Sequence, residues 1–465
     1  MTDTRRAAPT EKPVVLTIAG SDSGGGAGVQ ADLKTIEAMG GFGTSAITAV
    51  TAQNTLGVES THVLPAEEVT AQLDAVLSDF DVRAVKTGML ATTELVETVT
   101  DYATEFDCPL VVDPVMVAAS GDRLLDEAAE AAYDDLIAEA TLVTPNADEA
   151  AVLTDVDVGG GGHPDEAGAR LAGQRLLTAG ADAALVKGGH VPGEEILDVL
   201  VTPETIETAR NPRIDTEATH GSGCTLSSAI ATRLAHGEPL LDAVGRSVAF
   251  MQRAIRYHHD AGEGPGAVHH LAALRNEAAR EKTAETVHDV VSWLTSENVR
   301  PLVPEVGMNV VGATPYAESE GETAAVEGRI TKTLDGVEPN RGVRFGASSH
   351  VARFVLGGRE FFPELRFAVN CRFGDDVEAA IESLNWGVTE YDRAAEPDDA
   401  AGTMDWAARE AFGGRDDPPV AVVDRGAVGK EPMTKLVGAD AATVAERVVE
   451  LRDAVVGGSN GDRKA

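Results

Sequence analysis

Short aliphatic runs alternate with amphipathic stretches through the first 270 residues, and this alternation restricts the fold more than any other feature of the chain. The stretch 66–79 has four apolar residues at the i, i+4, i+7, i+8 spacing of a helix with one buried face: Val69, Leu73, Val76 and Leu77. Uniformly apolar strands that alternate with such helices are typical of a parallel sheet covered on both faces. We therefore predict an α/β fold, a mainly parallel sheet with helices on both faces, and strands at 14–18, 46–51, 83–87, 110–113, 142–144 and 183–187.

The character of the sequence changes near residue 275. A Gly-Glu-Gly-Pro-Gly turn cluster occupies 262–266, and 272–283 is charged and rich in alanine. At about 150 residues per domain, 465 residues allow two or three domains. We predict a first domain over 12–272, a helical connector over 273–283, a second and smaller α/β domain over 284–456, and a disordered tail over 457–465.

Acidic residues outnumber basic residues by two to one, with 76 Asp and Glu against 38 Lys and Arg and a formal net charge of −38. A field of this sign repels phosphate backbones, so we expect no nucleic-acid partner. Molar salt would screen the self-repulsion of such a chain. We interpret the composition, which is similar to that of haloarchaeal proteins, as an adaptation to a salt-loaded cytoplasm. A merely acidic enzyme is the alternative.

The sequence also restricts the compartment. No run approaches the roughly 18 uncharged apolar residues of a membrane span, and the first 13 residues have no apolar stretch behind their basic residues. The three cysteines (Cys108, Cys224 and Cys371) form no CxxC pair. We expect a cytoplasmic protein that has no membrane partner and forms a homo-oligomer.

A glycine-rich segment, Gly24 to Gly28, follows the first predicted strand. It lacks the GxxxxGK[ST] pattern of a Walker loop, and Val29 stands where the dinucleotide-binding fingerprint needs a glycine. On its own the segment predicts only a tight turn between a strand and a helix.

The string His220-Gly221-Ser222-Gly223-Cys224 precedes an apolar stripe at helical spacing and therefore predicts a helix N-terminus. Free N–H groups and the helix dipole at Gly221, Ser222 and Gly223 could stabilise a transferring γ-phosphoryl group. We expect the same helix end to depress the pKa of Cys224, whose thiolate would then take a proton from a substrate hydroxyl. A small buried cysteine under a helix cap is the alternative, and the string alone does not choose between the two.

Further polar residues follow predicted strands. Asn146 and Glu149 open a predicted helix, where they could hold a hydrated Mg²⁺ or could simply cap the helix and complement its dipole. Lys187 could reach a phosphate from a strand end. Asp113 also ends a strand, which is where open α/β sheets place their sites.

Taken together and in order, several strings closely resemble hydroxymethylpyrimidine/phosphomethylpyrimidine kinases, members of the ribokinase-like superfamily. The resemblance covers about residues 12–271. The strings that carry it are 17–35 (Thr-Ile-Ala-Gly-Ser-Asp-Ser-Gly-Gly-Gly-Ala-Gly-Val-Gln-Ala-Asp-Leu-Lys-Thr), Ala52-Gln53-Asn54-Thr55, Lys86-Thr87-Gly88-Met89-Leu90, Val112-Asp113-Pro114-Val115-Met116, Thr144-Pro145-Asn146, Lys187-Gly188-Gly189-His190 and Thr219-His220-Gly221-Ser222-Gly223-Cys224-Thr225.

This resemblance implies a ribokinase-like fold with ATP as phosphoryl donor and Mg²⁺ as cofactor. It implies that Cys224 is the catalytic base, and that Asp32 and Gln53 bind an aminopyrimidine beside the apolar Met89 and Val115. The family reaction is two successive phosphorylations, of a hydroxymethyl group and then of its monophosphate. The implied nucleotide site contains Lys187, Asp113, Gly221 and Gly223.

The second part of the chain, about 284–456, resembles the archaeal-type thiamine-phosphate synthase domain. The resemblance implies that Arg329 and His350 are required for activity, and that Arg344, Ser348 and Ser349 belong to a pocket for phosphate and pyrophosphate. From the residues alone, Arg344, Arg353 and Arg372 could equally pair with neighbouring acids. The strings are Pro304-Glu305-Val306-Gly307-Met308-Asn309, Gly328-Arg329-Ile330, 344–353 (Arg-Phe-Gly-Ala-Ser-Ser-His-Val-Ala-Arg), Asn370-Cys371-Arg372-Phe373 and Asp392-Arg393.

The two resemblances together imply a bifunctional enzyme of thiamine biosynthesis. Such an enzyme would make hydroxymethylpyrimidine diphosphate from the aminopyrimidine and ATP, and then join it to a thiazole phosphate with release of pyrophosphate. Two alternatives stay open: a pyridoxal-type kinase with an unrelated C-terminal partner, and a C-terminal domain that senses thiamine phosphate without catalysis.

Overall fold

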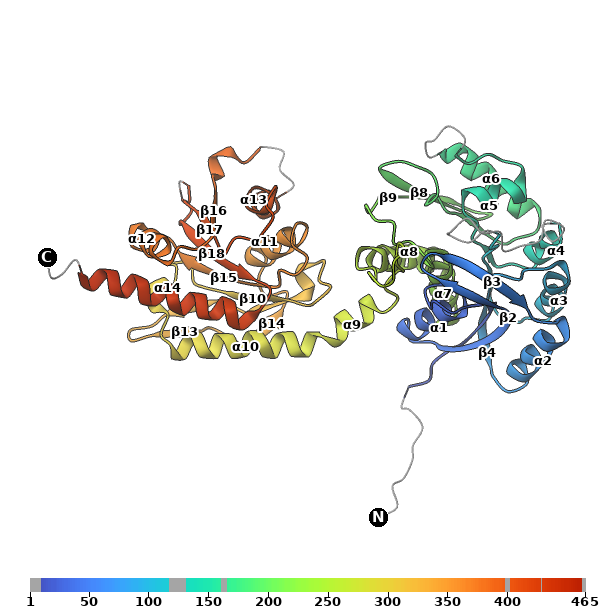
Figure 1. Cartoon of the computed structure of the whole chain (residues 1–465), viewed down its shortest axis with the longest axis horizontal. Coiled ribbons are helices and arrows are strands. Elements are labelled where there is room, and N and C mark those ends of the chain that lie inside the picture. Colours follow the sequence, from blue (N-terminus) through green and yellow to red (C-terminus); the bar gives the residue numbers. More distant parts are fainter. Residues whose placement is uncertain (1–9, 117–130, 160–164, 398–401, 428, 462–465) are drawn as a thin grey trace, which may run out of the picture. The chain divides into compact units, whose positions relative to one another are not determined.

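The computed structural model divides into two compact units, Met1–Leu274 and Arg275–Ala465 (Figure 1). Each unit has its own sheet and its own hydrophobic cores. The residues that the structure describes are 10–116, 131–159, 165–397, 402–427 and 429–461.

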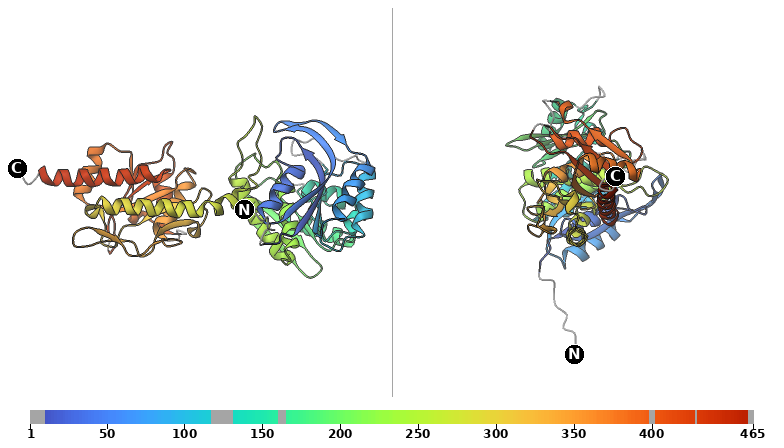
Figure 2. Two further views of the ribbon diagram at one scale, coloured as in Figure 1. Left: turned by 90° about the horizontal axis from the view of Figure 1, so that it is seen from below. Right: turned by 90° about the vertical axis from the view of Figure 1, so that its left-hand side faces the viewer.

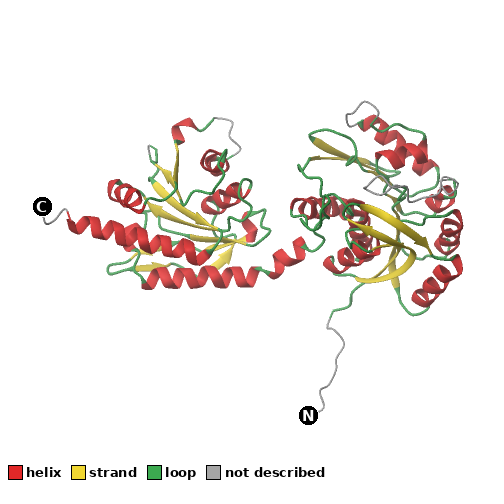
Figure 3. Ribbon diagram, viewed as in Figure 1, coloured by secondary structure: helices red, strands yellow, loops and turns green. Residues whose placement is uncertain are grey.

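A nine-stranded sheet forms the centre of the described part of the first unit (Figures 1 and 3). Its strands are β1 (Val14–Asp22), β2 (Phe42–Asn54), β3 (Gly57–Val63), β4 (Val82–Thr87), β5 (Leu110–Val112), β6 (Leu142–Val143), β7 (Ala184–Val186), β8 (Glu195–Val201) and β9 (Ile206–Pro212). They lie in the order β3-β2-β1-β4-β5-β6-β7-β8-β9. The pairs from β2 through β7 are parallel, whereas β3, β8 and β9 are antiparallel additions at the two edges. The predicted mainly parallel sheet is confirmed.

Helices cover both faces of this sheet, as predicted. They are α1 (Gly28–Ala38), α2 (Ala66–Leu77), α3 (Thr93–Ala103), α4 (Tyr133–Ala138), α5 (Ala147–Thr154), α6 (Glu166–Thr178), α7 (Ser222–Ala235) and α8 (Leu240–Arg256). Successive strand residues point to opposite faces. Val15 therefore packs in a core with α1, α7 and α8, and Leu16 beside it packs in another core with α2, α3 and α4.

The parallel strands share one direction, so their carboxyl ends meet at one edge of the sheet. Several chemistry-bearing residues stand at or just beyond these ends: Asp22 at β1, Gly88 after β4, Asp113 after β5, Asn146 after β6 and Lys187 after β7. The fold thus collects at one edge the polar residues that are scattered along the sequence.

The second unit is built on a mostly antiparallel sheet (Figure 2). Its strands are β10 (Val310–Ala313), β11 (Thr323–Val326), β14 (Val343–Phe345), β15 (Phe367–Arg372), β16 (Val388–Tyr391), β17 (Ala421–Asp424) and β18 (Met433–Gly438), in the order β14-β11-β10-β15-β18-β17-β16. Among the described strands of this second sheet, only the pair β16–β17 is parallel. A separate two-stranded ribbon pairs β12 (Ile330–Lys332) with β13 (Val337–Pro339).

Two cores lie in the second unit. One is formed with α10 (Arg280–Ser296), α12 (Asp375–Leu384) and α14 (Ala441–Gly461), the other with α11 (His350–Arg359) and α13 (Thr403–Phe412). The short helices η2 (Arg300–Leu302), η3 (Glu320–Glu322) and η4 (Arg393–Ala395) complete the unit. This second α/β region follows the first, as predicted.

The stretch 273–283, which we predicted to be a connector, is helical and consists of α9 (Ala272–Ala278) and the start of α10. Asn276 is only 2% exposed. Its amide donates to Glu322 at 2.6 Å and accepts a hydrogen bond from the Tyr316 N–H at 2.9 Å. A fragment of the second unit that begins at 284 would therefore lose buried contacts.

At the other end, α14 continues through Gly461, whereas we predicted disorder from 457. Each added helical residue gains one backbone hydrogen bond, which favours continuation over fraying. Residues 462–465 lie outside the described residues. None of the helices in the described part of the chain combines the length and the apolar character that crossing a bilayer requires.

Candidate active sites

A cavity of about 290 Å³ opens at the carboxyl ends of the parallel strands in the first unit. The motif residues that line it come from six different segments of the chain. They are Gln53, Met89, Asp113, Val115, Asn146, Glu149, Lys187, Gly221, Ser222, Gly223 and Cys224. The structure thus brings together every predicted site residue of this unit except Asp32.

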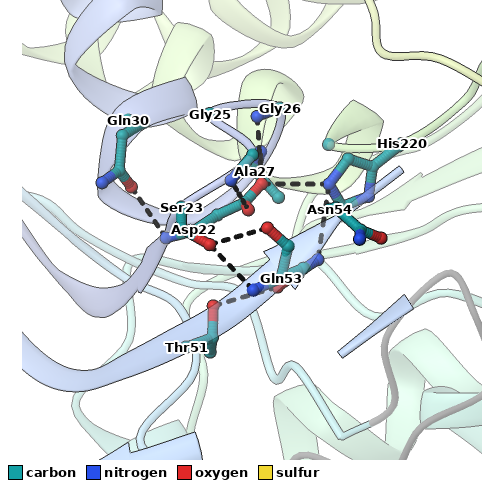
Figure 4. Close-up of polar contacts among 12 residues, drawn as sticks. Asp22, Ser23, Gly25, Gly26, Ala27, Gln30, Thr51, Gln53, Asn54 and His220 are labelled. Carbon is teal, nitrogen blue, oxygen red and sulfur yellow. Dashed lines mark hydrogen bonds and ion pairs between the residues drawn. The ribbon is translucent and has the colours of Figure 1, made fainter. Parts of the chain in front are cut away.

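The glycine-rich segment folds around the carboxylate of Asp22 (Figure 4). Oδ1 accepts the N–H of Gly24 at 2.7 Å, and Oδ2 accepts those of Gly26 and Ala27 at 3.0 and 2.8 Å. Nε2 of His220 lies 3.1 Å from the same Oδ2. Burial alone would raise the pKa of Asp22, but the hydrogen bonds from His220, Ala27 and Gly24 hold it below its usual value. Asp22 is therefore an anion that ties the glycine segment to the loop before α7.

The same two loops are in direct contact through glycines. Gly221, the N-cap of α7, has a φ of +79°. A Cβ atom at this position would lie 1.8 Å from the carbonyl oxygen of Gly26. Only glycine adopts this positive φ readily and also leaves room for the Gly26 carbonyl. Gly221, Ser222 and Gly223 all line the cavity at this end of α7, and the N–H of Ser222 donates to the carbonyl of Thr219 at 3.1 Å.

Cys224 lies in the first turn of α7 on the wall of the cavity. Burial raises the pKa of its thiol to about 11, with Asp32 and Asp113 adding to the effect and Lys86 opposing it. We expected the helix end to depress this pKa, and that expectation is wrong for the free enzyme. Desolvation by the surrounding protein outweighs the attraction of the helix N-terminus and of Lys86 for a thiolate.

Asp32 is fully buried and lies outside the lining of the cavity. Both of its oxygens accept hydrogen bonds from Lys86 Nζ at 3.0 Å, and the hydroxyls of Thr17 and Ser228 donate to it at 2.6 and 2.7 Å. The predicted contact between Asp32 and an aminopyrimidine is not supported by this geometry, because the carboxylate is saturated by internal donors. Asp32 instead holds a buried ion pair beneath Cys224.

Asn146 and Glu149 form a capping box at the start of α5. The Asn146 side chain accepts the Glu149 N–H at 2.9 Å, and the Glu149 carboxylate accepts the Asn146 N–H at 2.8 Å. Both residues also line the cavity, so the capping interpretation and the site interpretation are compatible. Burial and the nearby Asp113 together raise the pKa of Glu149 to about 7, against the opposing effect of Lys187.

This acidic wall suits a hydrated divalent cation. Lys187 Nζ donates to Asp113 Oδ1 at 2.9 Å and also acts on Glu149, and Lys86 is a second ammonium that acts on Asp113. A cation near Glu149 would relieve the carboxyl repulsion that raises its pKa. Among the described residues, no group of three His, Cys, Asp or Glu side chains forms a complete metal cage. Mg²⁺ typically needs none, because it keeps several waters and takes the rest of its ligands from substrate phosphates.

In the second unit, the backbone conformation singles out Arg329. Its φ is +70°, in the left-handed region, and it follows Gly328 at +79°. Such a conformation costs a non-glycine residue about 1–3 kcal/mol of stability. It persists where the surrounding structure holds the side chain in one direction. Nη1 of Arg329 donates to the carbonyl of Val306 at 2.5 Å.

His350 begins α11, and Ser349 Oγ lies 3.4 Å from its Nδ1. Burial lowers the pKa of His350, and the cations Arg329, Arg393 and Arg353 lower it further. The imidazole is therefore neutral at neutral pH, in a field that favours anions. Ser348, next to Ser349, is partly buried.

The remaining arginines of this region pair with acids, which is the alternative that the residues alone had left open. Arg344 lies 3.1 Å from Glu327, Arg353 2.5 Å from Glu320, and Arg372 2.6 Å from Asp376. The ion pairs of Arg344 and Arg353 are exposed, and pairs of this kind contribute little to the free energy of unfolding.

Sequence reasoning missed a buried polar cluster in this unit. Arg393 Nε donates to Asp424 Oδ2 at 2.7 Å, the Tyr391 hydroxyl donates to the same oxygen at 2.7 Å, and Lys435 Nζ donates to the Tyr391 oxygen at 2.8 Å. It also missed Asp22 and Lys86 in the first unit. Signals were available for three of these residues, because Asp22, Lys86 and Arg393 all lie in the strings that carry the two resemblances.

Comparison with known proteins assigns the first unit. Residues 22–269, more than half of the chain, match the family described as phosphomethylpyrimidine kinase. The chain belongs to this family. Hydroxymethylpyrimidine/phosphomethylpyrimidine kinase of Rhizobium meliloti is 47% identical over 261 residues, which cover 56% of this chain and 97% of that protein. Residues 286–450 match the family described as thiamine-phosphate synthase ThiN.

Further relatives agree with this assignment. The thiamine biosynthesis bifunctional protein ThiED of Geobacter sulfurreducens is 45% identical over 273 residues, 58% of this chain and 55% of that protein. The Bacillus subtilis pyridoxal kinase in its ADP complex has a TM-score of 0.53 and 31% identity, covering 57% of this chain and 99% of that one. The Staphylococcus aureus pyridoxal kinase bound to ADP also has a TM-score of 0.53 and 31% identity. The ribokinase-like fold of the first unit is confirmed.

Proposed function

We propose that the chain is a bifunctional enzyme of thiamine biosynthesis. The first unit phosphorylates hydroxymethylpyrimidine and then its monophosphate with ATP. The second unit condenses the resulting diphosphate with a thiazole phosphate and releases pyrophosphate. The observation that carries the proposal is the convergence of Gln53, Lys187 and Cys224 with the α7 N-terminus on one cavity, in a chain that matches both families.

In the kinase reaction, the N–H groups at Gly221 and Gly223 would stabilise the charge on the transferring phosphoryl group, and the N–H of Ser222 would join them on leaving the carbonyl of Thr219. Lys187 would bind a phosphate oxygen of ATP, and Asp113 would keep that ammonium in place. Mg²⁺ would be held through water by Asn146 and Glu149, and it would neutralise charge on the ATP phosphates. Met89 and Val115 would pack against the pyrimidine ring while Gln53 binds its polar edge.

Cys224 would accept the proton of the substrate hydroxyl as the phosphoryl group moves. Because burial keeps the thiol neutral in the free enzyme, kcat/KM should rise with pH toward the pKa of about 11. Cys224→Ala should remove this rise and lower turnover by at least about a hundredfold. Cys108→Ala is the matched control, because Cys108 packs against the core formed with α2, α3 and α4, on the face of the sheet opposite to α7 and Cys224. Near wild-type turnover in Cys224→Ala would assign catalysis to the N–H groups alone.

In the synthase reaction, Arg329 would bind an anionic group of the diphosphate with two parallel hydrogen bonds. The neutral His350 would orient the departing pyrophosphate together with Ser348, Ser349 and the guanidinium of Arg344. Arg329→Ala and His350→Ala should abolish condensation in the full-length chain while ATP-dependent phosphorylation continues. Synthase activity that survives both substitutions would reject these roles and favour a C-terminal domain that only senses thiamine phosphate.

One observation favours a second kinase substrate. The solved structures described above are pyridoxal kinases, with TM-scores of 0.53 for the two cited. A competition assay with pyridoxal and the aminopyrimidine decides between the substrates, because the true substrate should suppress phosphorylation of the other at equal concentration.

We further propose that the charge of −38 adapts the protein to a salt-loaded cytoplasm. Thermal melting should then move to higher temperature between dilute and molar KCl, because salt screens the repulsion among carboxylates. A melting temperature that is unchanged or falls would make the chain an ordinary acidic enzyme.

Domain limits of 12–272 and 284–456 and a homo-oligomeric state complete the proposal. Separately expressed units should each retain their own activity, and the second should be started at 275 so that it keeps the contacts of Asn276. Sedimentation of the full-length chain measures the oligomeric state.

A further inference from the structure

The side chain of Gln53 lies between two polar groups at the edge of the kinase cavity (Figure 4). One terminal atom of its carboxamide is 3.5 Å from His220 Nε2, and the other is 3.3 Å from the hydroxyl of Thr51. The backbone of Gln53 is held as well, because its N–H donates to Ser23 Oγ at 2.8 Å and its carbonyl accepts the Ser23 hydroxyl at 2.6 Å. The residue is fixed in place, and only the direction of its amide is open.

A carboxamide can occupy the same space in two orientations that exchange its oxygen and its nitrogen, so the partners decide which atom lies where. The orientation drawn in Figure 4 places the nitrogen beside His220. The two orientations present opposite donor and acceptor orders to a ligand in the cavity.

The first partner, His220, is a donor. Its Nε2 lies 3.1 Å from Oδ2 of Asp22, and Asp22 is anionic because three backbone N–H groups also donate to it. A carboxylate oxygen accepts hydrogen bonds only, so Nε2 has to carry the proton. An N–H group cannot accept a hydrogen bond from an amide nitrogen, whereas it can share its proton between the oxygens of Asp22 at 3.1 Å and Gln53 at 3.5 Å. The atom of Gln53 that faces His220 is therefore the oxygen.

The second partner, Thr51, gives the same answer independently. Its single hydroxyl proton is committed to the carbonyl oxygen of Ser21 at 2.9 Å, which is closer than the Gln53 amide at 3.3 Å. Toward Gln53, the Thr51 oxygen can then only accept. The atom of Gln53 that faces Thr51 is therefore the nitrogen.

We propose that His220 and Thr51 lock the Gln53 carboxamide with its oxygen toward His220 and its nitrogen toward Thr51, and thereby select the ring edge that the kinase accepts. This inference rests on the proposed function, in which Gln53 contacts the pyrimidine. The locked amide keeps one N–H and one oxygen lone pair for a ligand. A 4-aminopyrimidine supplies the complement, a ring nitrogen that accepts on the Thr51 side and an exocyclic amine that donates on the His220 side.

The lock predicts which analogue is rejected. A 4-oxopyrimidine carries a carbonyl where the amine was and an N–H where the ring nitrogen was, so its donor and acceptor order is reversed. Against the locked amide it would face two like groups and leave buried polar atoms unpaired. Sites built on such hydrogen bonds discriminate by about 10⁴–10⁵-fold, whereas sites that only differ in shape discriminate by about 10–200-fold.

The test compares phosphorylation of 4-amino- and 4-oxo-5-hydroxymethyl-2-methylpyrimidine by the full-length protein. Thr51→Val and His220→Phe each remove one side of the lock, and the double variant frees the amide to turn. The ratio of kcat/KM for the two substrates should fall by about tenfold in each single variant and by about a hundredfold or more in the double variant, mainly through KM. A double variant that keeps the full discrimination would overturn the proposal.

Two controls make the result specific. Thr44→Val removes another buried hydroxyl from the same strand, one that donates to the Val15 carbonyl, and it should leave the ratio unchanged. In ¹⁵N-histidine-labelled protein, the resonances that His220→Phe removes should show the proton on Nε2. A proton on Nδ1 would overturn the lock without any substrate. Failure of the wild type to phosphorylate either pyrimidine, with Nε2 protonated, would instead reject the proposed function and with it the ring-edge selection, while the locked amide would stand.

Discussion

Each unit contains a fully or almost fully buried lysine beside an aspartate, Lys86 with Asp32 in the first and Lys435 with Asp424 in the second, and these two pairs behave in opposite ways. In the first unit, Lys86 lies 3.0 Å from both oxygens of Asp32, and both side chains are fully buried. In the second unit, Lys435 is equally buried but lies 3.9 Å from Asp424. Burial lowers the pKa of both lysines, yet Asp32 reverses this effect and raises the pKa of Lys86, whereas the pKa of Lys435 falls to about 8.

The difference comes from which donors each carboxylate already serves, because the other side-chain donors to Asp32 are the neutral hydroxyls of Thr17 and Ser228. Asp424 accepts two nitrogens of Arg393 and the hydroxyl of Tyr391, so little of its charge is directed at Lys435. Arg393 also repels the ammonium and lowers its pKa further. A buried lysine close to an aspartate therefore does not by itself form a strong ion pair. The aspartate must also not be neutralised already by another cation.

The largest effect that would break this comparison is expected for Lys86→Met. Removal of the ammonium leaves Asp32 buried without a counter-charge, which should destabilise the first unit by about 3–5 kcal/mol. The free energy of unfolding of the first unit is measured in urea, with amide hydrogen exchange of residues 12–272 as the probe of unfolding. Asp32→Asn combined with Lys86→Met should recover much of it, because no charge is then left behind. A single variant as stable as the wild type would mean that Asp32 takes up a proton freely and that the pair is not ionic.

The next effect concerns pH and the second unit. The pKa of Lys435 in the folded chain, about 8, is below the value of 10.5 for a free lysine. Between these values the unfolded chain binds more protons than the folded chain, so stability rises with pH from 8 to 10.5, by about 3 kcal/mol in total. Below pH 8 both states are protonated and this contribution is absent. Lys86 adds nothing in the same window, because its raised pKa keeps it protonated when folded until well above pH 10.

Tryptophan fluorescence isolates this effect, since Trp293, Trp386 and Trp406, the three tryptophans of the chain, all lie in the second unit. The free energy of unfolding of the wild type, minus that of Lys435→Met, should rise through this window. A difference that stays flat from pH 7 to 10.5 would place the pKa of Lys435 at its ordinary value and would make the two lysines alike.

The smallest effect is expected for Lys435→Met at pH 7. The Lys435 ammonium lies 4.8 and 5.0 Å from the ring centres of Phe354 and Tyr391 and 3.9 Å from Asp424, and methionine replaces this buried charge with an apolar group of similar length. The second unit should be unchanged or gain about 1 kcal/mol, in contrast to the loss from Lys86→Met. The same fluorescence measurement checks it. A loss of several kcal/mol would show that Lys435 and Asp424 form a pair as tight as Lys86 and Asp32.

The comparison also explains what the sequence could and could not predict. Strand β1 was predictable because Val15, Leu16 and Ile18 are buried on both faces, which produces a continuous apolar run. The edge strands β3 and β9 were missed because most of their residues face solvent and carry mixed polar side chains. The cavity residues Gln53, Lys187 and Cys224 were found through motifs that the chain carries intact.

The remaining site residues depend on partners that are far apart in the chain. Asp22 meets His220 across 198 positions, and Lys86 meets Asp32 across 54. A string that contains Asp32 says nothing about whether its carboxylate faces a ligand or a buried lysine. The predicted direction of the Cys224 pKa shift was wrong for a similar reason. The helix N-terminus can be recognised in the sequence, but the depth at which the thiol is buried cannot.

The contact between Gly26 and Gly221 has a kinetic consequence. The two loops touch backbone to backbone at these glycines, and His220 Nε2 lies 3.1 Å from Asp22 Oδ2, so outward motion of one loop alone would break this polar contact with the other. The segment after β1 and the first turn of α7 must therefore loosen together, in a single cooperative event. A substrate that enters between them waits for one opening rather than two, and the backbone amides of both segments should exchange their hydrogens with deuterium at one common rate.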